Sequence, residues 1–225
     1  VGSEMCIRDR YRHRIQHLPY RVISLTGSSA HMRVIDPYSN KEKEMISFVS
    51  NDYLGLSHHP EVIKAGIDAL EQYGAGAGAS PLIGGHNFLH EQLEQEIAHF
   101  LKNEYAITYT SGYAANCSTL LAMMGKEDIA IMDMFTHASV FDGCLCTNTK
   151  RFLHNDIDSL VHVLNNAKSF KNRFVIIDGV YSQDGDIAFL DQIYTVCKEH
   201  DAFLIVDDAH GIGVLGKTGR GIIED

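Results

Sequence analysis

Between residues 106 and 206, short apolar runs alternate with stretches whose apolar residues recur at helical spacing. Nearly continuous apolar runs are typical of strands buried on both faces of a sheet, and helices between such strands carry the crossovers of a parallel sheet. The sequence therefore predicts an α/β fold, with a mostly parallel sheet and helices on both of its faces. The predicted strands are 106–109, 129–132, 174–177 and 203–206, and the predicted helices are 114–124, 157–164 and 193–197.

The residues before this alternation predict an N-terminal arm and two further helices. Apolar runs at 32–35 and 45–49 flank a turn-forming segment, which predicts a short hairpin. One amphipathic helix is expected to begin at Pro60 and end at Gly74, and another to cover 89–101. We expect three segments: a leader foreign to the protein at 1–10, the arm at 11–45, and one large domain at 46–225.

The composition excludes several classes of protein. The 225 residues carry a formal net charge of −10, and nucleic-acid binding depends on a surplus of Lys and Arg, so no nucleic acid is expected as a partner. No apolar run approaches the roughly 18–20 residues that cross a bilayer, so we expect no membrane span. The five cysteines are an odd number without a regular framework, which favours reduced thiols and a cytoplasmic protein.

Polar residues follow each predicted strand at the edge where such sheets bind ligands. In an open α/β sheet the ligand lies beyond the carboxyl ends of the strands. Four polar clusters occupy these positions, and together they predict a binding site. The clusters are residues 110–116, residue 133 with 136–139, residues 178–185, and residues 207–210.

Two of these clusters suggest a ligand with a phosphate and a cationic group. The small residues Ser111 and Gly112, before Tyr113, let backbone N–H groups and a helix dipole bind an anion, although a plain strand–helix turn has the same pattern. Asp207 follows four apolar residues, so its carboxylate suits a pyridinium nitrogen, a lysine or a metal ion, or it caps the chain. His137 and His210 belong to the same edge, either as site residues or as structural ones.

Three other patterns are weaker. Residues 211–216 match GxGxxG, but polar residues separate them from the strand and no helix follows, so a dinucleotide site is not expected. His86 and His90 have helical spacing without the glutamate of a zinc protease, and we expect no metal site. Ser182 lacks the GxSxG setting of a hydrolase nucleophile.

Five motifs occur in order: SNDYLGL at 50–56, TSGYAAN at 110–116, THAS at 136–139, DGVYSQDG at 178–185 and VDDAH at 206–210. Together they resemble the α-oxoamine synthases, a family of pyridoxal-phosphate enzymes, from about residue 46 to the end of the chain. The resemblance implies the large domain of a type I pyridoxal-phosphate transferase, as in aspartate aminotransferase. It also implies pyridoxal 5′-phosphate as the cofactor.

The resemblance implies cofactor contacts for four residues at these strand ends. The backbone at Gly112 and Tyr113 would hold the cofactor phosphate, with the following helix directed at it. His137 would stack on the pyridine ring and help to orient the substrate. Asp207 would pair with the pyridinium nitrogen and so keep the ring an electron sink.

Three further residues complete the implied site. His210 and Ser182 would hydrogen-bond the phenolic oxygen of the cofactor, and Asn51 would lie near the substrate. The catalytic residues implied by the resemblance are therefore His137, Asp207 and His210.

The implied reaction condenses an amino acid with an acyl-CoA to give a β-keto amine, in a homodimer. The family's Schiff-base lysine falls past the end of this chain, so we expect an incomplete large domain that is inactive by itself. Two alternatives stay open. One is another type I pyridoxal enzyme, an aminotransferase or a carbon–carbon lyase, and the other is a catalytically inactive partner subunit.

Overall fold

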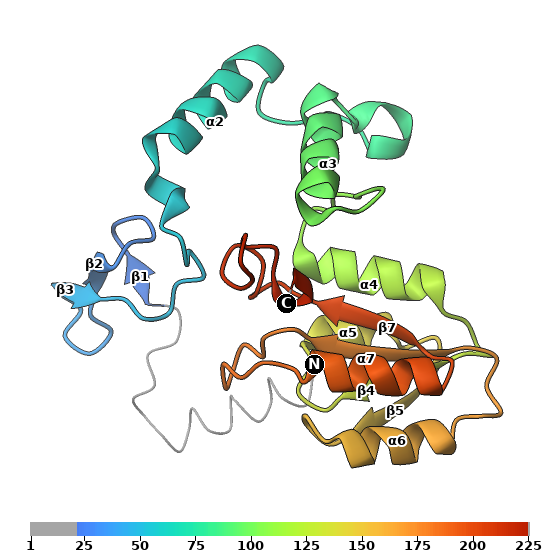
Figure 1. Ribbon diagram of the computed structural model, residues 1–225. Helices are drawn as coiled ribbons and strands as arrows, with labels where there is room; N and C mark the ends of the chain where they lie inside the picture. Colours follow the sequence, from blue (N-terminus) through green and yellow to red (C-terminus); the bar gives the residue numbers. More distant parts are fainter. Residues whose placement is uncertain (1–21, 225) are drawn as a thin grey trace. The chain divides into compact units, whose positions relative to one another are not determined.

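A computed structural model describes residues 22–224 of the chain (Figure 1). These residues belong to two compact units that divide after Gly85. The predicted leader at 1–10 and the start of the predicted arm lie outside the described residues, and the boundary at residue 46 remains a prediction. Among residues 22–224, no helix combines the length and the apolar character that a membrane crossing requires.

The first unit begins with a small antiparallel sheet. Its strands are β1 (Ile23–Ser24), β2 (His31–Ile35) and β3 (Glu42–Ile46), in the order β1-β2-β3. β2 and β3 pair with His31 opposite Ile46, and Asp36 accepts a hydrogen bond from the N–H of Asn40 in the turn between them. The predicted hairpin is therefore confirmed.

Helix α2 (Pro60–Tyr73) completes this unit together with the short turns η1 (Leu56–His58) and η2 (Pro81–Gly85). Pro60 occupies the first helical turn, where its missing N–H costs no hydrogen bond. Gly74 ends the helix with φ of 81°, a conformation that glycine adopts without strain. Both predicted ends of this helix are confirmed.

The second unit contains a four-stranded parallel sheet with helices between its strands (Figure 1). The strands are β4 (Ile129–Asp133), β5 (Asn148–Phe152), β6 (Arg173–Asp178) and β7 (Phe203–Asp207), in the order β5-β4-β6-β7. The helices are α3 (Phe88–Leu101), α4 (Gly112–Met123), α5 (Ala138–Gly143), α6 (Ile157–Asn165), α7 (Leu190–Glu199) and the short η3 (Ile222–Glu224).

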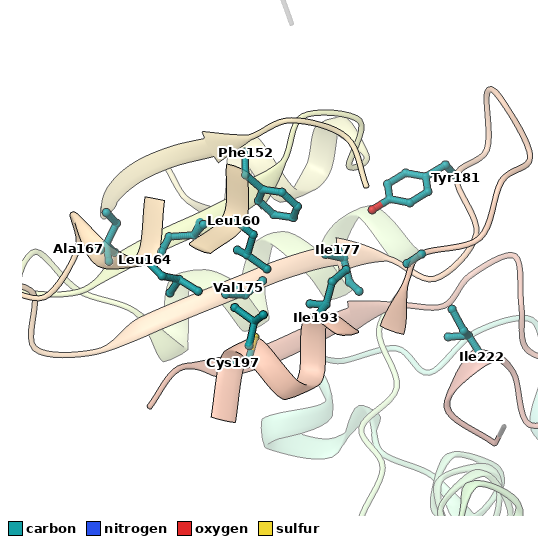
Figure 2. Close-up of a cluster of buried hydrophobic side chains, with 14 residues drawn as sticks. Phe152, Leu160, Leu164, Ala167, Val175, Ile177, Tyr181, Ile193, Cys197 and Ile222 are labelled. Atoms are coloured by element: carbon teal, nitrogen blue, oxygen red, sulfur yellow. The ribbon is translucent and has the colours of Figure 1, made fainter. Parts of the chain in front are cut away.

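Each face of this sheet has its own core, because successive strand residues point to opposite faces. Ile131 of β4 packs in one cluster with Leu160 of α6 and Ile193 of α7, and all three are fully buried. Figure 2 shows Leu160 and Ile193 in this cluster. Met132, the next residue, belongs to a second cluster with Leu120 of α4. Burial of each such side chain contributes about 1.5–3 kcal/mol. Helices therefore cover both faces, as predicted.

Two differences from the predicted elements have clear physical reasons. The predicted strand at 106–109 is wrong: the backbone N–H of Thr108 donates to Glu94 Oε1 of α3 at 2.8 Å, so a side chain takes the place of a neighbouring strand. The sequence missed β5, whose first four residues are exposed and polar because it lies at the sheet edge. The short helix α5 was also missed.

Candidate functional site

The N-terminus of α4 presents unused hydrogen-bond donors. The hydroxyl of Ser111 accepts a hydrogen bond from the N–H of Ala114 at 3.1 Å and so caps the helix. Among the described residues, no hydrogen bond uses the backbone N–H of Gly112 or Tyr113. Because the positive end of the helix dipole lies at the same point, these two N–H groups suit an anion.

The side chain of Tyr113 is directed toward α5. Its hydroxyl donates a hydrogen bond to the carboxylate of Asp142. This bond, together with desolvation and the negative charge of Asp142, raises the pKa of Tyr113 to about 12. The phenol is therefore protonated at neutral pH, and the side chain ties α4 to α5 at the end where the unused donors lie.

The half-buried carboxylate of Asp207 lies at the end of β7 and joins a chain of hydrogen bonds. Its Oδ2 accepts from Asn116 Nδ2 at 2.7 Å, and its Oδ1 accepts from the N–H of Ala209 at 3.1 Å. Asn116 Nδ2 also donates to Ser139 Oγ at 2.9 Å. Ser139 Oγ lies 2.7 Å from Nδ1 of His137. The structure thus brings Asp207 and His137, which are 70 positions apart in the chain, into one network.

Asp178 supports the same network from the end of β6. Its side chain is 5% exposed, and its Oδ2 accepts from the backbone N–H of His137 at 3.2 Å. Burial, followed by the negative charges of Asp207 and Asp133, raises the pKa of Asp178 to about 7, although the N–H of His137 opposes the shift. Near neutral pH both the protonated and the ionised form of this carboxyl group are therefore populated.

Asp208 lies beside this network in a space that glycines leave open. Its Oδ2 accepts from the N–H of Ile222 at 2.9 Å. A Cβ atom at Gly211 would lie 2.1 Å from Asp208 Oδ1, and one at Gly221 would lie 1.8 Å from Oδ2. Gly211, the first glycine of the GxGxxG match, therefore makes room for a carboxylate of this chain. Burial raises the pKa of Asp208 above its ordinary range.

The remaining predicted site residues lie on turns. Ser182 is exposed in the turn after β6, and His210 is half-buried after β7, three residues beyond Asp207. Asn51 belongs to the first unit, where its Oδ1 accepts a hydrogen bond from the hydroxyl of Tyr53 at 3.5 Å. The roles of these three residues stay predictions.

His86 and His90 do not share a helical face, as their i, i+4 spacing predicted, because α3 begins only at Phe88. His86 precedes α3, and Asn87 caps that helix through the N–H groups of Leu89 and His90. Nδ1 of His90 accepts the backbone N–H of Asn87 at 3.1 Å, so His90 serves the cap.

Sequence reasoning missed the roles of Asn116, Ser139 and Asp178. All three stand inside the motifs at 110–116, 136–139 and 178–185, so their positions were available. Only the register of the strands and the packing of α4 on α5 place their side chains between Asp207 and His137. Nothing in the local sequence predicts that contact.

Comparison with known proteins decides the family. The family model for aminotransferase class I and II matches residues 43–223. The chain belongs to this family. Similar curated proteins include 8-amino-7-oxononanoate synthases of Saccharophagus degradans (40% identical; 95% of this chain, 53% of that protein) and of Geobacter sulfurreducens (39%; 91% and 52%). The chain thus spans about half the length of the curated relatives it matches.

Solved structures agree with this assignment. Serine palmitoyltransferase of Sphingomonas wittichii superposes with a TM-score of 0.89 at 31% identity, covering 99% of this chain and 55% of that chain. The S. paucimobilis enzyme, solved with a bound PLP–myriocin aldimine, has a TM-score of 0.89 at 30% identity, covering 98% and 55%. The type I fold is therefore confirmed, and within the family the chain belongs to the α-oxoamine synthases.

Proposed function

We propose that this chain forms much of a pyridoxal 5′-phosphate site, and that the protein which contains it condenses an amino acid with an acyl-CoA to a β-keto amine. One observation carries the proposal. A chain of hydrogen bonds joins Asp207 to His137 in the unit whose helix α4 leaves the N–H groups of Gly112 and Tyr113 without acceptors.

The residues present fit this cofactor on chemical grounds. Two unused N–H groups at the start of a 12-residue helix suit a phosphate. The donors to Asp207 from Asn116 and Ala209 are neutral, so they orient the carboxylate and leave its negative charge for a cation. Bound pyridoxal phosphate supplies an electron sink for negative charge at the Cα atom of an amino acid.

The hydrogen bonds suggest what each residue contributes. Asp207 keeps a proton on a pyridine nitrogen by pairing with the cationic form. His137 presents its ring to the cofactor, and its orientation is held by Ser139 at the ring and by Asp178 at the backbone. Asn116 connects the two, so that neither side chain moves independently.

Three further residues complete the proposed site. His210 and Ser182 hydrogen-bond the phenolic oxygen, and Asn51 contacts the substrate, in keeping with the family motifs in which they stand. We place the protein in the cytoplasm as a homodimer.

The names of the relatives favour one branch of the family. Curated relatives at 39–40% identity are 8-amino-7-oxononanoate synthases, and residues 51–60 and 207–211 resemble that branch most. The proposed activity is therefore that of an 8-amino-7-oxononanoate synthase-like acyltransferase. Serine palmitoyltransferase structures at 30–31% identity support the same type of condensation with a different substrate pair.

The test uses the intact protein with pyridoxal phosphate, a panel of amino acids and a panel of acyl-CoAs. We expect a cofactor absorbance band and release of CoA for one substrate pair. Asp207→Asn should weaken cofactor binding at least tenfold, whereas Asp191→Asn, which changes an exposed carboxylate on α7, should not. If the two variants bind pyridoxal phosphate equally well, the assignment of Asp207 to the cofactor site is contradicted. Amino-group transfer to a keto acid without CoA release would identify another type I enzyme.

A further inference from the structure

His154 lies just beyond β5 and bridges two carboxylates with its two ring nitrogens. Its Nδ1 lies 3.0 Å from Asp133 Oδ1, and its Nε2 lies 2.6 Å from Asp186 Oδ2. Asp133, at the end of β4, is fully buried, and the His154 side chain is 18% exposed. Because a carboxylate can only accept, the geometry suits an imidazolium that donates from both nitrogens.

Aromatic rings hold the imidazole on two further sides. Phe135 stacks on it with a centroid distance of 4.4 Å, and Tyr181 meets it edge-on, also at 4.4 Å. Tyr181 is 1% exposed and follows β6 (Figure 2). Burial opposes the charged form of His154, but the hydrogen bonds to Asp133 and Asp186 outweigh it and raise the pKa of His154.

The contacts of His154 connect the ends of β4 and β5 to the turn after β6. Asp133 belongs to β4, His154 follows β5, and Tyr181 and Asp186 belong to the turn after β6. The turn itself is closed by the N–H of Tyr181, which donates to the carbonyl oxygen of Asp186 at 3.0 Å, and by the N–H of Gly185, which donates to Tyr181 at 2.8 Å. His154 therefore anchors both ends of a short exposed turn to the buried end of the sheet.

Asn155, the next residue, strengthens the same anchor. Its backbone N–H donates to Asp133 Oδ2 at 3.0 Å, and its side-chain amide donates to Asp186 Oδ2 at 3.1 Å. Each of the two carboxylates thus receives one hydrogen bond from His154 and one from Asn155. A change at His154 alone leaves the Asn155 contacts in place, so the fold of the sheet need not be lost.

Ser182 follows Tyr181 directly in this turn, and its own side chain is exposed. We propose that His154 is a positioning residue, which holds the turn 181–186 so that Ser182 can reach the phenolic oxygen of the cofactor. This inference rests on the proposed function, because Ser182 has a ligand only if pyridoxal phosphate binds. His154 acts through Asp186 and Tyr181 and touches no reacting atom.

The first measurement is amide hydrogen exchange in the intact protein without cofactor. We expect His154→Gln to speed exchange in residues 181–187 at least tenfold, with little change in β4 and β6. His162→Gln, which changes an exposed histidine on α6, is the matched control and should leave the exchange unchanged. Unchanged exchange in His154→Gln would overturn the inference.

The second measurement is the absorption maximum and the affinity of bound pyridoxal phosphate. We expect Ser182→Ala to shift the maximum and weaken binding, His154→Gln to shift it in the same direction, and the double variant to add nothing further. A purely structural role of His154 predicts additive losses and no spectral shift. Additive effects therefore contradict the positioning role.

Two further variants keep the outcomes separate. Asp186→Ala removes the partly exposed carboxylate of the bridge but leaves the backbone hydrogen bonds that close the turn. If His154→Gln does not fold, Asp186→Ala replaces it in the test and should show the faster exchange in residues 181–187. Asp207→Asn tests the proposed function in the same assay. If Asp207→Asn binds the cofactor normally, the proposed function fails. If Asp207→Asn loses the cofactor but the His154 and Asp186 variants behave like the parent protein, the proposed function stands and the positioning role fails.

Discussion

The buried carboxyl group of Asp178 makes a quantitative prediction about pH. Its ordinary pKa is 3.8, and burial with two neighbouring carboxylates raises it to about 7 in the folded protein. Between these values the folded state binds a proton that the unfolded state has lost, so stability falls as the pH rises. The loss is about 1.4 kcal/mol for each pH unit up to pH 7 and levels off above it.

Asp178→Asn removes this dependence, because the amide cannot ionise and its carbonyl oxygen can still accept the N–H of His137. Urea unfolding of the intact protein at pH 5, 6, 7 and 8 measures the effect. From pH 5 to pH 8 we expect the free energy of unfolding of the variant to increase by about 3 kcal/mol relative to the parent protein. Asp158→Asn, an exposed carboxylate on α6, serves as the control and should show no such trend.

The result that refutes this reasoning is a constant difference between Asp178→Asn and the parent protein from pH 5 to pH 8. It would mean that Asp178 ionises without penalty in the folded protein, and therefore that water or a cation reaches a side chain that is 5% exposed. A variant that is less stable at every pH would instead show that the bond to His137 needs the carboxylate.

Three further predictions concern the core, α4 and the Asp207 network. Leu160→Ala should lower the free energy of unfolding by about 2–5 kcal/mol in urea, because Leu160 is fully buried; a loss below about 0.5 kcal/mol would contradict the packing. Asp142→Asn should lower the pKa of Tyr113 from about 12 toward its ordinary 10. The titration is followed by tyrosinate absorbance, with Tyr113→Phe as the reference that identifies the signal of Tyr113, and an unchanged titration would exclude the hydrogen bond. Asn116→Ala should weaken pyridoxal-phosphate binding by about tenfold to a hundredfold, as loss of a hydrogen bond to a charged group costs about 1.5–3 kcal/mol, and equal affinity in a titration would exclude its role.

An element was predictable from the sequence where its own residues determine its structure, and was missed where a neighbouring element determines it. The run Ile129–Met132 is apolar at every position because both faces of β4 are covered, so its burial is visible in the sequence. β5 is an edge strand with four exposed residues, so its own residues do not show that it pairs with β4. The run 106–109 is apolar enough for a strand, but Thr108 bonds to Glu94 and no ladder forms.

The candidate site divides in the same way. The positions of His137, Asp207, His210 and Ser182 after the predicted strands were enough to predict the edge of the sheet at which they lie, because parallel strands end at the same edge. Their direct connection was not predictable. Asn116 reaches Asp207 across 91 positions, and His154 reaches Asp186 across 32 positions, through contacts that depend on the placement of whole elements.

By itself, then, the sequence determined the α/β class, the family and the segments that carry the candidate site, because periodicity and motif order are local properties of the chain. The tertiary structure decided which side chains share a hydrogen bond and which carboxylates lose contact with water. It showed that Asp178 is buried beside other carboxylates, that glycines open a space for Asp208, and that His154 anchors a turn. Burial and hydrogen bonding depend on distance in space, and residues far apart in the chain become neighbours only when the sheet and its helices assemble.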